Sequence, residues 1–464
     1  MVRDHTGATR KRADGSLRRL AKVGCIKGKF MPMLLFGLCI FFLSNVQAFA
    51  ASAHFCPPFE PPQSPDRKQV LVRGGDVQGL LHTLKTAPAN TTVLLADGVY
   101  TLNSNQSLEI RQPRITIRST SRNRDAVIIE GGDSNIAVNV DDFTVADVTL
   151  RSPRYHNIHV RGNQGVVRTI IYNVRLQDAG QQLVKVSAGD GTKGKFADDG
   201  LIACSLIEYT TYARGNDKTP PTYTNGVDIL AGKGWVIRDN VFRRIRSQAG
   251  PAGPAILAWR NSIDTVVIRN VIIDSWRGIT LGLRPAHHHS RGGPQEQYDH
   301  QNGLIENNVI LALHEPADAA IENNYALNSR VLHNTVYYNP ELKHAVDWAI
   351  EYRFPPTTAI IQNNLTNLPI RKRHPEPQQE AVIAGNVTHA LADWFRDVMA
   401  GDVRLTQRAL ALDKGVPLPA SREDMEGNPR PAGQALASGA YEFFDRSAIP
   451  KSPPVTTPRQ SQSQ

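Results

Sequence analysis

The sequence lacks several of the signals that most simply reveal what a protein does. Its 464 residues include only 4 cysteines, and no CxxC pair or Cys/His spacing suggests a zinc site. No leucine-dominated consensus is present, so a leucine-rich repeat is excluded. The short apolar segments show no helical period between them, which argues against a helical solenoid.

The first fifty residues differ from the rest and have the order of a secretory signal peptide. A basic stretch with Lys22, Lys27 and Lys29 precedes an apolar core at 33–43, and small residues end the segment at Ala50. The core of 11 residues is shorter than the roughly 20 residues that span a bilayer. We therefore expect a secreted or periplasmic protein with no stable membrane insertion after cleavage, although a retained anchor is the open alternative.

Removing this leader changes both the charge and the cysteine count. The leader holds nine of the 53 basic residues and two of the 43 acidic ones, which leaves 44 and 41. A mature net charge of +3 is no sign of a nucleic-acid binder. Cys25 and Cys39 leave with the leader; Cys56 and Cys204 remain, and whether they pair cannot be decided from the sequence.

A short motif recurs along the chain. VIRDNVF at 236–242 returns as VVIRNVI at 266–272 and LIENNVI at 304–310, and the mean interval is about 30 residues. A repeat of this length built from β-branched strands predicts a stack of coils. Aligned on the polar residue before the second apolar group, the bend column is Asp147, Asn173, Ser205, Asn240, Asn270, Asn308, Thr335, Asn364 and Asn386.

These units predict an all-β chain folded as a single-stranded, right-handed parallel β-helix of about ten coils. Stacked asparagines can pass hydrogen bonds from coil to coil, so we interpret the column as structural. Residues 76–87 have the apolar spacing of an amphipathic helix that would cap the open end. We expect a signal peptide at 1–50, a Pro-rich lead-in at 51–69, the β-helix at 70–445 and a disordered tail at 446–464.

The opening LLADGVYTL, the coils, and the closing GDVRLTQRALALDKG with GQALASGAYEFF resemble secreted right-handed β-helix proteins of the pectate-lyase-like superfamily. The resemblance runs from about Val70 to Phe444. It implies the fold more than the reaction, because that superfamily includes lyases, hydrolases, epimerases and binding proteins. The epimerase run Asp-Pro-His-Asp, the paired aspartates of polygalacturonases and the Lys and Arg motifs of alginate and chondroitin lyases are not evident.

One strand of each coil predicts an exposed row of side chains. If the first aliphatic residue of each strand points inward, the next points outward. This row is His159, Lys185, Asp228, Leu257, Thr280, Glu322 and Glu351. The same alternation adds Trp259 and Arg353, and Arg260 and Arg284 lie at strand ends. Basic groups, carboxylates and an aromatic ring on one face suit an acidic polysaccharide.

A histidine-rich loop leaves this face after Leu281. It lengthens the interval between Asn270 and Asn308 to 38 residues and carries His287, His288, His289, Arg291 and His300. Loops on a rigid stack often carry function, and histidine is a natural acid or base near neutral pH. A solvated loop with incidental histidines is the simpler alternative.

We predict a polysaccharide lyase that cleaves a uronate polymer by β-elimination. Lys185, His287 or His289 would be the base, and Arg260, Arg284 or Arg353 would neutralise the uronate carboxylate. His159, Trp259, Glu351 and Arg291 would bind substrate, and Asp228 with Glu322 would hold calcium. A hydrolase or epimerase on the same face, or a non-catalytic binding protein, is the alternative. We expect a monomer whose partner is the polysaccharide, with no nucleic acid.

Overall fold

The computed structural model describes residues 55–60, 64–190, 193–212, 214, 223–283, 291, 298–418, 420–431 and 436–443. The predicted leader and tail, and with them Arg284, His287, His288 and His289, lie outside these residues. The described part belongs to one compact unit. None of its helices is long and apolar enough to cross a membrane.

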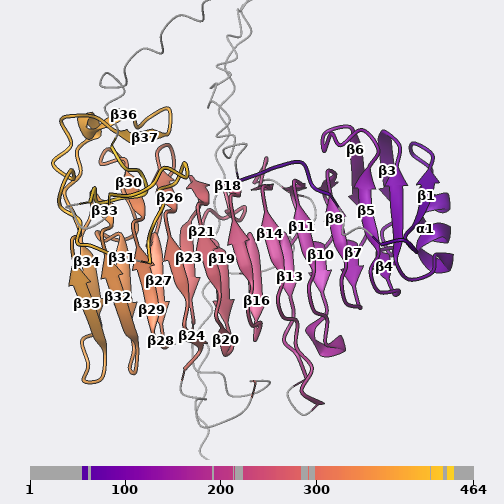
Figure 1. Cartoon of the computed structure of the whole chain (residues 1–464), viewed down its shortest axis with the longest axis horizontal. Coiled ribbons are helices and arrows are strands. Elements are labelled where there is room, and N and C mark those ends of the chain that lie inside the picture. Colours follow the sequence, from indigo (N-terminus) through magenta and orange to yellow (C-terminus); the bar gives the residue numbers. More distant parts are fainter. Residues whose placement is uncertain are drawn as a thin grey trace, which may run out of the picture. The chain divides into compact units, whose positions relative to one another are not determined.

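Three long parallel sheets run along the stack of coils, and most coils contribute one strand to each sheet (Figure 1). Register partners are successive turns of the chain, such as Ile237 with Val267 and Val267 with Ile305. The ten-strand length of two sheets agrees with the predicted number of coils. The predicted parallel β-helix is therefore confirmed.

Sheet A has twelve strands, which are β1 (Lys68–Val72), β2 (Thr91–Leu95), β5 (Thr116–Ser119), β8 (Thr144–Ala146), β11 (Ile170–Tyr172), β14 (Leu201–Ala203), β17 (Val236–Arg238), β21 (Val266–Ile268), β25 (Leu304–Glu306), β29 (Ser329–Leu332), β32 (Thr358–Gln362) and β35 (Glu380–Ala384). Sheet B has ten strands, which are β3 (Gly98–Leu102), β6 (Val127–Gly131), β9 (Thr149–Arg151), β12 (Arg175–Gln177), β15 (Leu206–Glu208), β18 (Val241–Arg243), β22 (Val271–Ile273), β26 (Val309–Ala312), β30 (Thr335–Tyr338) and β33 (Leu365–Thr366).

Sheet C also has ten strands, which are β4 (Leu108–Ile110), β7 (Ser134–Val138), β10 (His156–Val160), β13 (Val184–Val186), β16 (Val227–Leu230), β19 (Pro254–Trp259), β23 (Arg277–Leu281), β27 (Ile321–Asn324), β31 (Ile350–Arg353) and β34 (Ile370–Arg373). A small sheet joins β20 (Ser262–Ile263), β24 (His300–Gln301) and β28 (Ala326–Leu327). An antiparallel pair, β36 (Phe395–Asp397) and β37 (Asp402–Leu405), follows the last coil.

The predicted cap is the one α-helix of the described residues, α1 (Val77–Thr86). Asp76 begins it by accepting a hydrogen bond from the backbone N–H of Gly79 at 2.8 Å. Leu80 and Leu84 are buried and join the core that the inward strand residues form along the stack. The helix thus covers apolar surface that the first coil would otherwise expose.

An asparagine ladder runs through the bend between sheets A and B. Nδ2 of Asn240 donates to Oδ1 of Asn270 at 3.0 Å, and the same bond repeats from coil to coil. The ladder consists of Asn240, Asn270, Asn308, Asn334, Asn364 and Asn386. The structural interpretation of this column is confirmed.

The predicted column is nevertheless wrong by one residue in three coils. Asp147 and Asn173 have φ of +57° and +49° and lie one position before the ladder, which Val148 and Val174 occupy in those coils. Thr335 lies one position after Asn334. The residue with left-handed backbone precedes the ladder residue, and both positions favour polar side chains, so an alignment on polar residues cannot separate them.

Candidate functional site

The predicted outward row lies on sheet C with the register that the sequence analysis assigned. His159 pairs with Lys185, Lys185 with Asp228, and Asp228 with Leu257. The row continues through Thr280 and Glu322 to Glu351. Adjacent members are therefore one strand spacing apart, about 4.8 Å.

The predicted exposure of this row is wrong. Lys185 is 8% exposed, Asp228 3%, Glu322 1% and Glu351 0%, and only His159 is partly open. The alternation of a strand determines which face a side chain takes, but loops of other coils can still cover that face. The row divides into a closed half near β23–β34 and a half at β10–β16, of which His159 borders a cavity.

The closed half is a network of ion pairs around two glutamates. Arg353 contacts both of them, through Nε at 3.1 Å from Oε1 of Glu351 and Nη2 at 3.5 Å from Oε1 of Glu322. Trp348 donates its indole N–H to Glu351 at 2.7 Å, and Thr280 donates its hydroxyl to Glu322 at 2.7 Å. Burial, followed by the neighbouring Glu351 charge, raises the pKa of Glu322 against the lowering effect of nearby arginines. Both carboxylates are thus satisfied from within the protein.

The other half begins with a buried ion pair. Nζ of Lys185 lies 2.5 Å from Oδ2 of Asp228, and the Trp259 indole donates to Oδ1 of Asp228 at 2.8 Å. The structure thus brings the predicted neighbours Lys185, Asp228 and Trp259 together. Lys185 and Trp259 both bind Asp228, however, so these polar groups are engaged within the protein. Nζ of Lys185 is engaged by the Asp228 carboxylate, which makes Lys185 a weak candidate for a base.

Next to this pair, a cavity of about 540 Å³ opens over the outward face of the first coils of sheet C. Its volume lies in the range of small-ligand sites. It is lined by Asn105, Gln106, Ser107, Glu109, Asp133, Ser134, Tyr155, His156, His159, Arg161 and Gln181.

His159 is the most unusual side chain of this cavity. Burial, followed by Arg161 and Lys185, lowers its pKa to about 4, so the imidazole is neutral at pH 7. Its Nε2 atom is buried and has no hydrogen-bond partner among the described residues. Its ring packs edge to face against His156 at 5.1 Å, and burial lowers the pKa of His156 to about 3.

Arg161 is the cation of the cavity. Its Nη2 lies 3.1 Å from Oε1 of Glu109 and its Nη1 donates to Asn139 at 2.9 Å, while the side chain stays 37% exposed. Tyr155 supplies a phenol on the same wall, beneath the Arg154 guanidinium at 4.9 Å. Tyr155, His156 and Arg161 were not predicted. The sequence could have predicted Arg161, because it follows His159 by two residues and therefore takes the same strand face. Arg353 was predicted in this way from Glu351.

The calcium prediction for Asp228 and Glu322 does not fit this geometry. Leu257 and Thr280 stand between them in the row, so they are three spacings, or about 14 Å, apart. Calcium ligands lie within about 2.6 Å of the ion, so these two carboxylates cannot share one. Each also has a cation at hand. Within the described residues, no cluster of three or more Asp, Glu, His or Cys is arranged to hold a metal.

The remaining predicted residues are used elsewhere in the structure. Arg291 forms an ion pair with Asp198, donates to the Ala231 carbonyl at 3.1 Å and stacks on Phe196. Arg260 has φ of +56° and its guanidinium lies 4.9 Å from the Trp259 ring. His300 is wholly buried in β24, where its Nε2 contacts the Thr265 hydroxyl.

The described geometry defines a parallel β-helix with an ionisable cavity on one face. No protein-family model matches the chain, and no curated protein sequence matches it. Solved structures do match. Pectate lyase Pel9A is 11% identical with a TM-score of 0.50, covering 85% of this chain and 100% of its own.

The alginate lyase from Paenibacillus sp. str. FPU-7 is 15% identical with a TM-score of 0.43, covering 69% of this chain and 98% of that one. The family 28 exopolygalacturonase of Yersinia enterocolitica is 9% identical with a TM-score of 0.33, covering 70% and 78%. At 11% identity the likeness to Pel9A shows the fold alone, and that fold is the predicted parallel β-helix.

Proposed function

We propose that the protein is a secreted polysaccharide lyase that cleaves a uronate polymer by β-elimination at the cavity beside His159. The observation that carries this proposal is the neutral, unpartnered imidazole of His159 next to Arg161 and Lys185. A β-elimination needs a base for the proton on C5, a cation near the carboxylate and an acid for the leaving oxygen. The similarity in fold to the pectate lyase Pel9A supports the same class.

In this proposal His159 is the base that removes the C5 proton. The C–H electron pair forms the C4=C5 double bond, the bond from C4 to the glycosidic oxygen breaks, and that oxygen takes a proton from the Tyr155 hydroxyl. Arg161 binds the uronate carboxylate, with the Lys185 charge behind it. A bound carboxylate also opposes the cations that lower the pKa of His159, so the substrate itself makes the base stronger.

The direct test is to incubate the protein with pectate, alginate and glycosaminoglycans, with and without calcium. Elimination leaves an unsaturated uronate whose ultraviolet absorbance rises as the polymer is cut. We expect this rise on at least one uronate polymer, and none with His159→Ala. The absence of any rise on all polymers would contradict the proposal, and binding without cleavage would favour a non-catalytic polysaccharide-binding protein. Calcium stays a prediction that this assay tests.

The Glu322 and Glu351 pair favours a second candidate, a glycoside hydrolase. Two carboxylates on adjacent strands, one with a raised pKa, can serve as acid and base or nucleophile. Both are buried and Arg353 contacts both, so a sugar reaches them only if neighbouring side chains move. Reducing ends that appear without ultraviolet absorbance would support this candidate.

Two observations support the proposal that the protein is secreted: the predicted leader at 1–50 and a disulfide bond. Cys56 and Cys204 are bonded in the structure, which settles the pairing that the sequence left open. Disulfides persist in oxidising compartments. Expression with the natural leader should place the protein outside the cytoplasm, and retention of all of it inside would argue against secretion.

A further inference from the structure

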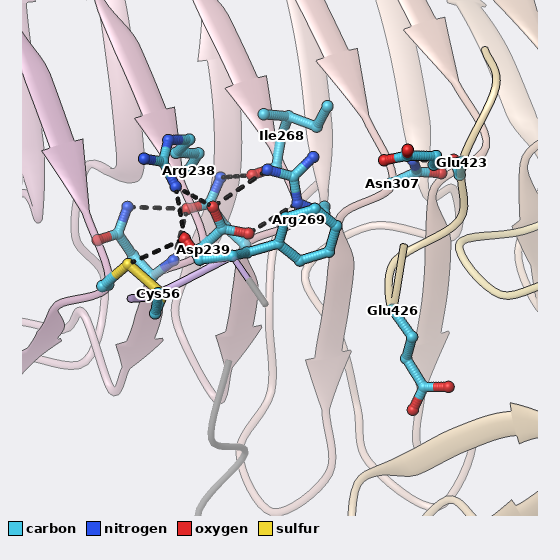
Figure 2. A network of polar contacts seen from close by, with 12 residues as sticks. Cys56, Arg238, Asp239, Ile268, Arg269, Asn307, Glu423 and Glu426 are labelled. Carbon is cyan, nitrogen blue, oxygen red and sulfur yellow. Dashed lines mark hydrogen bonds and ion pairs between the residues drawn. A yellow bond between two sulfur atoms is a disulfide. The ribbon is translucent and has the colours of Figure 1, made fainter. Parts of the chain in front are cut away.

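The lead-in at 55–60 crosses the outside of the bend between sheets A and B. We call it the strap. Its anchors come from successive coils, so the strap runs along the stack; it is the indigo segment that passes from near β18 toward β8 in Figure 1. Figure 2 shows one end, where Cys56 lies beside the Arg238, Asp239 and Arg269 network. The anchors are Arg238 on the Phe55 carbonyl, Cys204 on Cys56, Tyr172 on the Pro57 carbonyl and Arg118 on the Phe59 carbonyl.

A cavity of about 530 Å³ lies between the strap and the adjoining edge of sheet B. Cys56, Pro57, Pro58 and Phe59 form one wall. The other walls carry five arginines and only two carboxylates. These are Arg118, Arg122, Arg124, Arg175 and Arg243, with Asp147 and Asp239.

Both carboxylates are already paired. Asp147 lies 2.6 Å from Nη2 of Arg118, and Asp239 binds Arg238 and Arg269 at 2.7 Å each. The cavity therefore holds more cations than its own anions neutralise.

Two of the arginines remain without a carboxylate among the described residues. Arg124 makes only long contacts of 3.4 Å, to the Asn173 side chain and the Cys204 carbonyl. The side chain of Arg243 has no hydrogen-bond or ion-pair partner within the described part of the chain, and its Nε is buried. The Nε of Arg175 is buried and unpartnered as well. Buried donors in folded proteins are almost always paired, so these nitrogens indicate a missing acceptor.

We propose that this cavity binds an oxyanion group, a sulfate, phosphate or carboxylate, held by Arg124 and Arg243 under the strap. Guanidinium groups donate in pairs to the oxygens of such groups. The volume leaves room for a sugar unit that carries the group, so a free ion and a sugar acid are both admissible sources. The site lies on the bend between sheets A and B, whereas the His159 cavity lies on sheet C, and it does not depend on the proposed reaction.

Isothermal titration calorimetry on the full-length protein tests the proposal with sodium sulfate, sodium phosphate and sodium glucuronate, each against sodium chloride at equal ionic strength. We expect saturable binding of at least one oxyanion but not of chloride. The double variant Arg124→Gln/Arg243→Gln should weaken it at least about tenfold, since each lost charge-assisted bond removes a sizeable part of the affinity. The exposed Arg396 gives the matched control Arg396→Gln, which should bind as the wild type does.

Sulfate or phosphate binding without glucuronate binding would identify a free ion as the source, and tighter glucuronate binding would identify a sugar acid. No binding beyond chloride, or equal binding by the double variant, would overturn the proposal. If the double variant melts early, Arg243→Gln alone gives the same comparison, because Arg243 has no partner whose loss would destabilise the fold.

Discussion

The two halves of the outward face of sheet C carry similar side chains and use them differently. Near β27 and β31, Glu322 and Glu351 are buried, Trp348 donates a hydrogen bond to Glu351, and Arg353 contacts both carboxylates. Near β10, His159 borders a cavity and its buried Nε2 has no hydrogen-bond partner among the described residues. Buried ionisable groups that satisfy one another belong to the structure, whereas an unsatisfied group beside a cavity is free to meet a ligand.

The largest expected effect is a loss of activity in the half that borders the cavity. His159→Ala should lower kcat/KM by about 10²–10⁴, the usual contribution of a general base, and leave the melting temperature almost unchanged because the ring makes no hydrogen bond. Steady-state kinetics on the cleaved polymer and thermal unfolding measure the two quantities. His159→Gln, which keeps the volume but cannot act as a base, should be equally inactive; an active His159→Gln would remove the residue from the proposed mechanism.

The next largest effect is expected in the closed half, where a substitution should lower the free energy of unfolding. Glu351→Ala leaves Arg353 and the Trp348 indole facing an empty site, and breaking a buried ion pair costs about 3–5 kcal/mol. Urea unfolding should show this loss. The variant protein that remains folded should keep its lyase kcat, and a selective loss of kcat with normal stability would instead place Glu351 in the active site.

The sequence predicts the register of the strands in sheet C correctly but predicts the solvent exposure of their outward side chains incorrectly. Alternation along a strand fixes which face each side chain takes, and stacking then places His159, Lys185 and Asp228 in one row. What covers that row depends on loops such as the one that carries Trp348, three residues before Glu351, and their path is not encoded in any strand pattern. The asparagine ladder follows the same logic. Its existence is readable from the repeat, but its place relative to the left-handed residue is not.

The pH dependence of stability should have opposite signs in the two halves. The pKa of His156 is about 3 in the folded protein, below the unfolded value of about 6.5. The stability that comes from burying the neutral His156 ring is complete above pH 6.5 and is lost as the pH falls toward 3. At pH 5 this loss amounts to about 2 kcal/mol. The pKa of Glu322 is raised, so its burial costs most at high pH and this cost is relieved as the pH falls toward 4.5.

Unfolding curves between pH 5 and 8 on His156→Gln and Glu322→Gln measure these terms. Relative to the wild type, His156→Gln should gain stability as the pH falls, and Glu322→Gln should gain as the pH rises. Parallel curves for all three proteins would mean that neither group has a shifted pKa in the folded state.

The smallest expected effect compares two arginines on the same face. Arg161 borders the cavity, and Arg371 stands next to Glu351 in the row but is exposed and pairs with Asp347 at 3.1 Å. If Arg161 binds the uronate carboxylate equally in the ground state and the transition state, Arg161→Gln should raise KM about tenfold with kcat nearly unchanged. Arg371→Gln should change neither constant. A fall in kcat for Arg161→Gln would show that its charge acts on the developing carbanion, and a rise in KM for Arg371→Gln would extend the substrate path onto the closed half.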